Sequence, residues 1–143
     1  MKVASILNGK GDSIVAVQCR ANLQTAAELL SSHKIGAVVV HDDDGSLAGI
    51  LSERDIVRAI AHRGPSALEA PVTSAMTDRV VTCRSSDTVD HVMELMTGGR
   101  FRHMPVVDEN NMRGIISIGD VVKHHIAEVE MEASALKTYL VAG

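Results

Sequence analysis

Apolar positions follow the same order of spacings twice along the chain, which predicts a duplicated set of elements. Continuous or alternating apolar runs predict short strands, and apolar residues three and four positions apart predict helices. The first copy has predicted strands at 14–17, 37–40 and 47–51 and predicted helices at 23–32 and 52–62. The second copy has predicted strands at 80–81, 104–107 and 112–116 and predicted helices at 88–97 and 118–141. Short apolar turns are expected ahead of these elements at 3–7 and 72–76.

Residues that cap or stop helices support these boundaries. Asn22 is placed to cap the helix at the start of the first copy, and Ser86 or Asp87 is placed to cap its counterpart in the second. Polar residues at 31–33 and the glycine pair at 98–99 are expected to end the same two helices.

The duplication predicts the domain organisation and the fold class. A unit of roughly 60 residues buries too little surface to be comfortable alone, so two copies are expected to pack together. The expected parts are a repeat at 1–64, a second repeat at 65–126 and a C-terminal helical extension at 127–143. The fold class is mixed α/β (α+β), with two pseudo-symmetric β-α-β-β-α repeats packed through their sheets and a long C-terminal helix.

The strongest chemical signal is the motif Gly-apolar-apolar-Ser-x-x-Asp, which occurs at 49–55 and again at 114–120. Each serine lies where a strand gives way to a helix, next to free N–H groups and the positive end of the helix dipole that favour phosphate. Each aspartate has two oxygens to accept the hydroxyls of a ribose, and each glycine permits close approach of backbone to ligand. The alternative is a capping box, in which serine and aspartate only bond each other's backbone. The residues concerned are Ser52, Asp55, Ser117 and Asp120.

Composition limits the classes of function that are expected for the chain. The chain has 143 residues, a formal net charge of -4, one Phe, one Tyr and no Trp, so a basic or stacking surface for nucleic acid is not expected. No apolar run approaches the ~20 residues that span a bilayer, and the first residues lack the apolar h-region of a signal peptide, so a cytoplasmic protein without membrane association is expected. Cys19 and Cys83 fall at equivalent points of the repeats and are interpreted as small apolar fillers.

The chain resembles a tandem pair of CBS domains, a Bateman module of the small stand-alone bacterial kind. The resemblance rests on the two motifs, on residues 35–40, and on residues 101–108 with their P-V-V-D ending. It implies a regulatory sensor that binds an adenosyl nucleotide such as AMP, ATP, NAD, NADH or S-adenosylmethionine in a cleft between the repeats. It also implies that the serines and aspartates of the two motifs contact phosphate and ribose, and that modules pair into a disc-shaped dimer.

The two copies differ in charge near the motifs. Arg102 and His103 precede the second motif, whereas the first copy has Gly36-Ala37 there, and Arg54 lies inside the first motif. If the halves pack symmetrically, these three cationic or titratable groups converge on phosphate, the alternative being surface salt bridges. The expected ligand-binding set is completed by Cys83, Met104, Pro105 and Ile115.

The C-terminal helix carries a heptad stripe. Its apolar residues recur at spacings of four and three, which predicts homodimerisation through this helix. The stripe consists of Val122, Ile126, Val129, Ala133, Leu136 and Leu140.

Other functions have weaker support. A dimerisation or interaction module with a vestigial nucleotide site is the alternative, and a regulated partner protein is left open. An enzyme is not expected, because no nucleophile has an adjacent base, and no catalytic cofactor is implied. The neighbours His124 and His125 point about 100° apart on a helix, so even with Glu128 nearby no metal site is expected.

Overall fold

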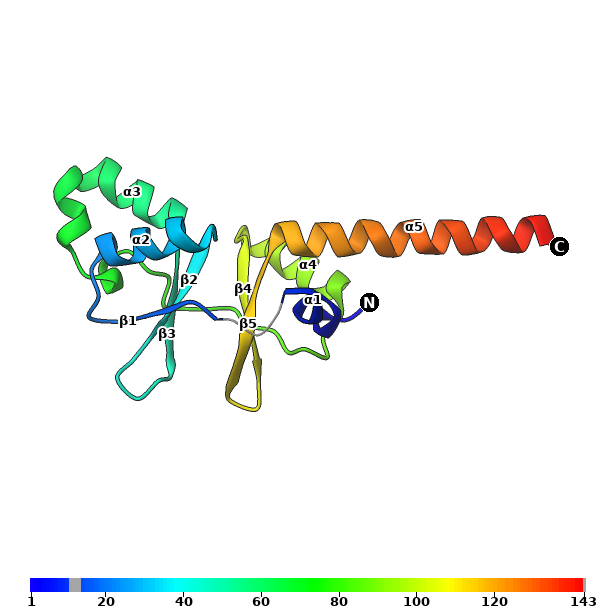
Figure 1. Ribbon diagram of the computed structural model, residues 1–143, viewed down its shortest axis with the longest axis horizontal. Helices are drawn as coiled ribbons and strands as arrows, with labels where there is room; N and C mark the ends of the chain where they lie inside the picture. Colours follow the sequence, from blue (N-terminus) through cyan, green and yellow to red (C-terminus); the bar gives the residue numbers. More distant parts are fainter. Residues whose placement is uncertain (11–13, 143) are drawn as a thin grey trace. The chain divides into compact units, whose positions relative to one another are not determined.

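Contacts divide the chain into two compact units (Figure 1). The structure is a computed structural model that describes residues 1–10 and 14–142. The middle unit is Ser13–Val81, and the terminal unit combines Met1–Asp12 with Thr82–Gly143. Within the described part of the chain, no helix is both long enough and apolar enough to cross a bilayer.

The middle unit is a three-stranded sheet with helices. In chain order its elements are β1 (Ala16–Gln18), α2 (Leu23–His33), β2 (Ala37–His41), β3 (Leu47–Ser52), α3 (Glu53–Arg63) and the 3₁₀ turns η1 (Pro65–Glu69) and η2 (Val72–Ser74). The sheet order is β1-β2-β3, with β1 parallel and β3 antiparallel to β2. As the central strand, β2 is apolar and buried from Ala37 to Val40. This continuous apolar run fits a strand covered on both faces.

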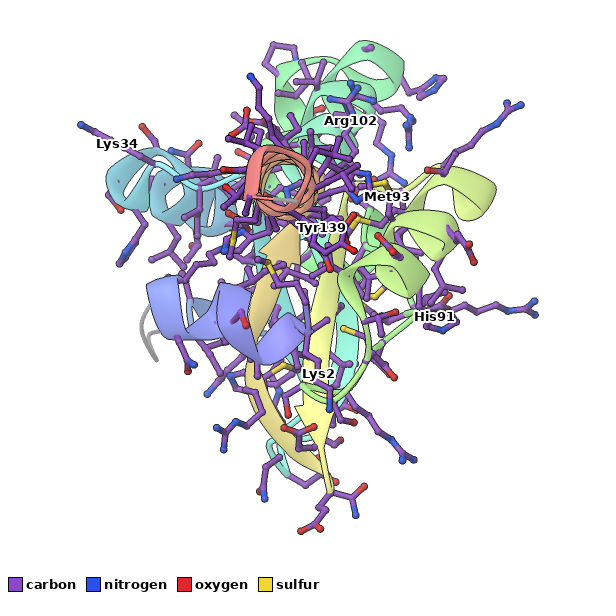
Figure 2. The ribbon with its side chains drawn as sticks, turned by 90° about the vertical axis from the view of Figure 1, so that its right-hand side faces the viewer. Lys2, Lys34, His91, Met93, Arg102 and Tyr139 are labelled. Atoms are coloured by element: carbon purple, nitrogen blue, oxygen red, sulfur yellow. The ribbon has the colours of Figure 1, made fainter. Side chains whose placement is uncertain are left out.

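The terminal unit is a two-stranded hairpin with three helices. Its elements are α1 (Val3–Lys10), α4 (Val89–Gly99), β4 (His103–Asp108), β5 (Asn111–Ser117) and α5 (Ile118–Ala142). Figure 2 looks along α5 and shows α1 and α4 on opposite sides of the hairpin. The prediction of a mixed α/β fold with a long C-terminal helix is confirmed.

The strand predicted at 80–81 is wrong, because neither residue belongs to a strand. Instead, Cys83 makes an isolated parallel bridge to Val106, with hydrogen bonds from Cys83 N–H to the Pro105 carbonyl and from Val107 N–H to the Cys83 carbonyl. Two apolar residues gave too short a run to fix the position of pairing. The sheet of the terminal unit therefore keeps only this bridge where the middle unit has β1.

Helix caps explain two further corrections. Asn22 caps α2 as predicted, because its side chain accepts from the backbone N–H of Thr25. The cap of α4 is Thr88, not Ser86 or Asp87, and its side chain accepts from the N–H of His91. The carboxylate of Asp87 accepts instead from the N–H of Arg84.

Both helices end at a basic residue in the left-handed conformation, not at the predicted stop signals. Lys34 has φ 54° after α2, and Arg100 has φ 57° after α4. The glycine pair at 98–99 lies inside α4. Because non-glycine residues adopt this conformation at some cost, it is difficult to anticipate from sequence.

The segment ahead of each repeat joins the compact unit of the other repeat. Val3 N–H donates to the Asp87 carbonyl in the terminal unit, and Val72 N–H donates to the Ala21 carbonyl in the middle unit, at 2.9 and 2.8 Å. Val3 and Val72 are both fully buried. The repeat boundaries at 64 and 126 stay a prediction about the sequence, and the compact units group these segments differently.

Candidate functional site

The glycine of each motif lies against the segment that precedes the other repeat. A Cβ on Gly49 would lie 2.6 Å from the Met76 sulfur and 2.7 Å from the Thr77 carbonyl oxygen. A Cβ on Gly114 would lie 2.9 Å from a methyl carbon of Leu7. The sequence predicted close approach of a ligand to the backbone at these glycines, which stays a prediction; in the structure they lie against equivalent residues of the chain itself, Met76 and Leu7.

The first motif starts α3 as a complete capping box. Asp55 Oδ2 accepts from the backbone N–H and the hydroxyl of Ser52, at 2.9 and 3.0 Å. In return, the Asp55 N–H donates to Ser52 Oγ at 3.3 Å. Arg58 on the same helix pairs with this aspartate, 3.5 Å from Asp55 Oδ1. The predicted cation Arg54 is exposed on α3 and has no ion pair with Asp55.

A hollow of about 410 Å³ adjoins this motif in the middle unit. Arg58 and His62 lie one helical turn apart on α3 and both line it, together with Asp55. Sequence reasoning missed these two groups, although their spacing from Asp55 was visible. The hollow therefore places basic side chains beside the first motif aspartate.

The second motif starts α5 with the same reciprocal bonds. Ser117 N–H donates to Asp120 Oδ2 at 2.9 Å, and Asp120 N–H donates to Ser117 Oγ at 3.1 Å. The capping alternative is thus realised in both motifs. Each serine and aspartate still lies at the N-terminus of a helix, where the partial positive charge favours anions.

Lys10 is the residue of this site that sequence reasoning missed. Its ammonium group donates to Asp120 Oδ2 at 2.7 Å and to the Ile115 carbonyl at 3.0 Å. Lys10 ends α1, which reaches β5 and α5 within the terminal unit. The available signal was the alignment of residues 3–7 with 72–76, which places Lys10 opposite another basic residue, Arg79.

Burial and hydrogen bonding act in opposite directions on Asp120. Partial burial raises its pKa, but the hydrogen bond from Lys10 and those from Ser117 outweigh burial, so the pKa lies below its ordinary value of 3.8. Asp120 is therefore held as a carboxylate at neutral pH, which keeps it an acceptor for hydroxyl groups.

Strand β4 brings the other predicted residues close to the second motif. His103 is in register with Ser117, and the Arg102 carbonyl accepts from the N–H of Ile118 at 2.7 Å. Met104 and Pro105 are buried in β4, and Pro105 is in register with Ile115. Because the register of a hairpin fixes which side chains share an edge, these residues lie around the start of α5.

Cys83 is buried in the terminal unit. Burial, together with the smaller effect of the charges of Asp87 and Asp108, raises the pKa of its thiol to about 12. The thiol is neutral at physiological pH, which fits its interpretation as a small apolar residue and gives no activated nucleophile.

The two adjacent histidines point to different partners, as the rotation along a helix requires. His124 Nδ1 lies 2.9 Å from the Asp120 carbonyl, whereas His125 Nδ1 lies 3.0 Å from Asp90 Oδ1. Asp90, His125 and Glu128 offer ligand atoms within 4.8 Å of one another, with Asp90 as a third member that the sequence did not reveal. Glu128 pairs with the amino group of Met1 at 2.8 Å.

Each of the two small units has a β-hairpin that enters a helix through Ser-x-x-Asp, so the chain is a tandem duplication of one α/β unit. The family model of the CBS domain matches residues 11–62 and 72–126. The chain belongs to the CBS-domain family, whose members are typically regulatory modules.

Individual relatives share this architecture. A CBS-domain protein from Agrobacterium tumefaciens, ATU1752, has a solved structure with 50% identity and a TM-score of 0.82, covering 85% of this chain and 91% of that one. YhcV of Bacillus subtilis is 28% identical over 94% of both chains. The mitochondrial protein CBSX3 of Arabidopsis thaliana is 36% identical over 82% of this chain, which spans 59% of the CBSX3 length.

One structural neighbour has been solved with ligands. The CBS domain pair of protein MJ0100, in complex with 5′-methylthioadenosine and S-adenosyl-L-methionine, is 26% identical with a TM-score of 0.77. The matched region covers 87% of this chain and 99% of the MJ0100 chain. Adenosine-type ligands are therefore bound by a CBS pair of closely similar fold.

Proposed function

We propose that the chain is a regulatory module that binds an adenosyl nucleotide of the AMP, ATP or NAD type. The observation that carries the proposal is the duplicated motif, in which an aspartate lies one turn into a helix in each unit. The ligands of the MJ0100 pair support the same class of ligand. Within this proposal the chain is a sensor and not an enzyme.

In this proposal, the aspartate and serine of each motif contact different parts of the nucleotide. Asp55 and Asp120 accept the vicinal hydroxyls of a ribose, and Ser52 and Ser117 present helix N-termini to phosphate. Arg54, Arg102 and His103 are proposed as phosphate contacts. The apolar pocket lining proposed from the resemblance consists of Cys83, Met104, Pro105 and Ile115.

A thermal-shift panel tests this function. AMP, ADP, ATP, NAD, NADH and S-adenosylmethionine are added to the wild type, Asp55→Asn, Asp120→Asn and the exposed control Asp78→Asn. Asparagine keeps one oxygen to cap the helix but loses the charge and the second acceptor. At a concentration of about 100 Kd, one bound ligand adds roughly 2.7 kcal/mol of stability, so a shift of several degrees is expected for wild type and control. The function is refuted if no ligand raises the melting temperature of the wild type. It is also refuted if both motif variants show the same ligand-induced shift as the wild type.

A dimerisation module with a vestigial site is the second candidate. It is favoured by the complete capping boxes, because serine and aspartate satisfy each other in both motifs without a ligand. For this candidate, Asp55→Asn and Asp120→Asn lower stability only by the loss of a negative charge near a helix N-terminus, about 0.3–1 kcal/mol, and no nucleotide shifts the wild type.

Homodimerisation through α5 is part of the proposal. The large residues of the heptad stripe are between 40% (Val122) and 68% (Leu140) exposed. A heptad stripe is self-complementary, so a second copy of α5 offers the same knobs and holes to this one. The occupant proposed for this surface is therefore a second copy of the chain.

Light scattering after size exclusion tests the dimer. Leu136→Glu places a charge in the stripe and is expected to give monomers, because a buried unpaired carboxylate costs several kcal/mol. Met131→Glu is the matched control, since Met131 is equally large, 68% exposed and on the opposite side of the helix. A monomeric wild type, or a Leu136→Glu variant that remains dimeric, contradicts the assignment.

A further inference from the structure

We propose that Lys10 sets the ligand preference of the second motif, favouring adenosyl ligands with a 5′-phosphate over those with a neutral or cationic 5′-substituent. This inference rests on the function proposed above. It concerns which adenosyl ligand is preferred, not whether one is bound.

The Lys10 ammonium group is held by two acceptors. It lies 2.7 Å from Asp120 Oδ2 and 3.0 Å from the Ile115 carbonyl oxygen, and the Lys10 and Asp120 side chains are 40% and 25% exposed. Both acceptors flank the start of α5, at the end of β5 that carries the motif. The chain thus supplies its own cation to the carboxylate that is proposed to bind ribose.

Binding of a ribose requires this cation to move. Asp120 Oδ2 already accepts from Lys10 and from the Ser117 N–H. A vicinal diol that bonds both carboxylate oxygens competes with Lys10 for Oδ2, because a carboxylate oxygen has room for about two donors. The N–H of Ser117 is fixed in the backbone, so the flexible lysine is the donor that is displaced.

The displaced ammonium group stays close to the ligand. A lysine side chain has four methylene groups and turns its charge over several ångströms around a fixed Cα. The 5′-substituent of a ribose lies within that range of the 2′ and 3′ hydroxyls. A 5′-phosphate then gives Lys10 a new charge-assisted partner, a 5′-methylthio group gives it none, and the sulfonium of S-adenosylmethionine repels it.

The first motif provides an internal contrast. Asp55 is paired with Arg58 from its own helix at 3.5 Å, and the Arg58 side chain is 66% exposed. Arg58 meets Oδ1, whereas Oδ2 is held by Ser52. An exposed pair of this kind is worth little and is easily rearranged, so Arg58 holds Asp55 less firmly than Lys10 holds Asp120.

Isothermal titration of the 143-residue chain tests the proposal. AMP, 5′-methylthioadenosine and S-adenosylmethionine share the adenosine group and differ in the charge of the 5′-substituent. The wild type is measured first, and the other measurements use Asp55→Asn as the background, so that the second motif dominates binding. Into this background are placed Lys10→Met, Lys10→Arg and the control Lys137→Met, which removes the same charge from an exposed position on α5.

The Kd ratio of 5′-methylthioadenosine to AMP is the readout. Loss of one charge-assisted bond is expected to lower the ratio about tenfold in Lys10→Met, while Lys10→Arg and Lys137→Met keep it within about twofold. S-adenosylmethionine is expected to bind more tightly to Lys10→Met. A general structural defect weakens all three ligands alike and leaves the ratio unchanged.

Each alternative outcome is distinct. An unchanged ratio in Lys10→Met with normal binding of AMP overturns the role of Lys10 and leaves the proposed function standing. Absence of binding by every ligand to every variant, including the wild type, overturns both. A higher ratio in Lys10→Met assigns the phosphate preference to another group and also overturns the proposal.

Discussion

The two motif glycines allow a matched test of the exchanged segments, because the same substitution meets different atoms in the two units. In Gly49→Ala the new methyl group lies 2.7 Å from the Thr77 carbonyl oxygen, which is backbone, and 2.6 Å from the Met76 sulfur. The same carbonyl accepts from Ile50 N–H at 3.0 Å, and Thr77 N–H donates to the Ile50 carbonyl at 2.9 Å. Relief of the clash therefore displaces a bridge that holds residues 72–77 against β3.

The expected cost follows from which atoms must move. Overpacking that shifts backbone costs about 1–3 kcal/mol, so Gly49→Ala is expected to destabilise the protein by about 2 kcal/mol. Gly114→Ala meets only the tip of Leu7, at 2.9 Å, which moves by side-chain rotation. Its cost is offset by the lower entropy of the unfolded chain, about 0.4–1 kcal/mol for Gly→Ala, and the net change is expected within about 0.5 kcal/mol.

Urea unfolding followed by circular dichroism measures the difference in the absence of ligand. Gly9→Ala is the control, because a Cβ on Gly9 has nothing within 4 Å and lies in α1, where alanine adds up to about 1 kcal/mol. Gly9→Ala is expected to be the most stable, wild type and Gly114→Ala to follow within about 0.5 kcal/mol of each other, and Gly49→Ala to be the least stable. The reasoning is refuted if Gly114→Ala loses as much stability as Gly49→Ala, or if Gly49→Ala is as stable as the wild type.

Three further predictions follow from the caps, the buried thiol and the motif carboxylate. Thr88→Ala is expected to cost about 1 kcal/mol in urea unfolding, whereas Ser86→Ala, at an exposed residue that is not the cap, is expected to be neutral; equal losses contradict the assigned cap. With a pKa of about 12, Cys83 is expected to resist iodoacetamide at pH 8 in the native protein, while the partly exposed Cys19 is alkylated first, as mass spectrometry of tryptic peptides will show. Because the pKa of Asp120 is lowered on folding, its stabilisation is present above about pH 3.8 and is lost as the pH falls through the folded value. The loss of melting temperature between pH 7 and pH 3 is thus expected to be smaller in Asp120→Asn than in wild type, and an equal loss contradicts this assignment.

Local patterns predicted the elements whose signals lie within a few residues. The strand at 37–40 appears as β2, and the helix at 23–32 as α2 with its Asn22 cap, because burial on both faces and a side-chain cap leave direct marks in sequence. The strand at 80–81 and the ends of α2 and α4 were missed. Pairing through a single bridge and a left-handed lysine or arginine are decided by packing, which local composition does not record.

Of the candidate site, the sequence predicted only the duplicated Ser-x-x-Asp motifs. Ser52, Asp55, Ser117 and Asp120 occupy equivalent capping geometries, as two copies of one motif require. Lys10 was missed, because it lies 110 residues from Asp120 and belongs to a segment that precedes the other repeat.

The exchange of segments makes the two motifs chemically different despite their common pattern. Each motif receives its glycine contact from the segment ahead of the other repeat, Leu7 at Gly114 and Met76 at Gly49. The same α1 that supplies Leu7 also carries Lys10 to Asp120, so the cation is positioned by the packing of this short helix. Any ligand that displaces Lys10 therefore acts on α1 as well as on the start of α5. Coupling from the second motif to the helix proposed for dimerisation is thus expected to depend on Lys10, and a ligand-induced change in dimer affinity that survives Lys10→Met would disprove that dependence.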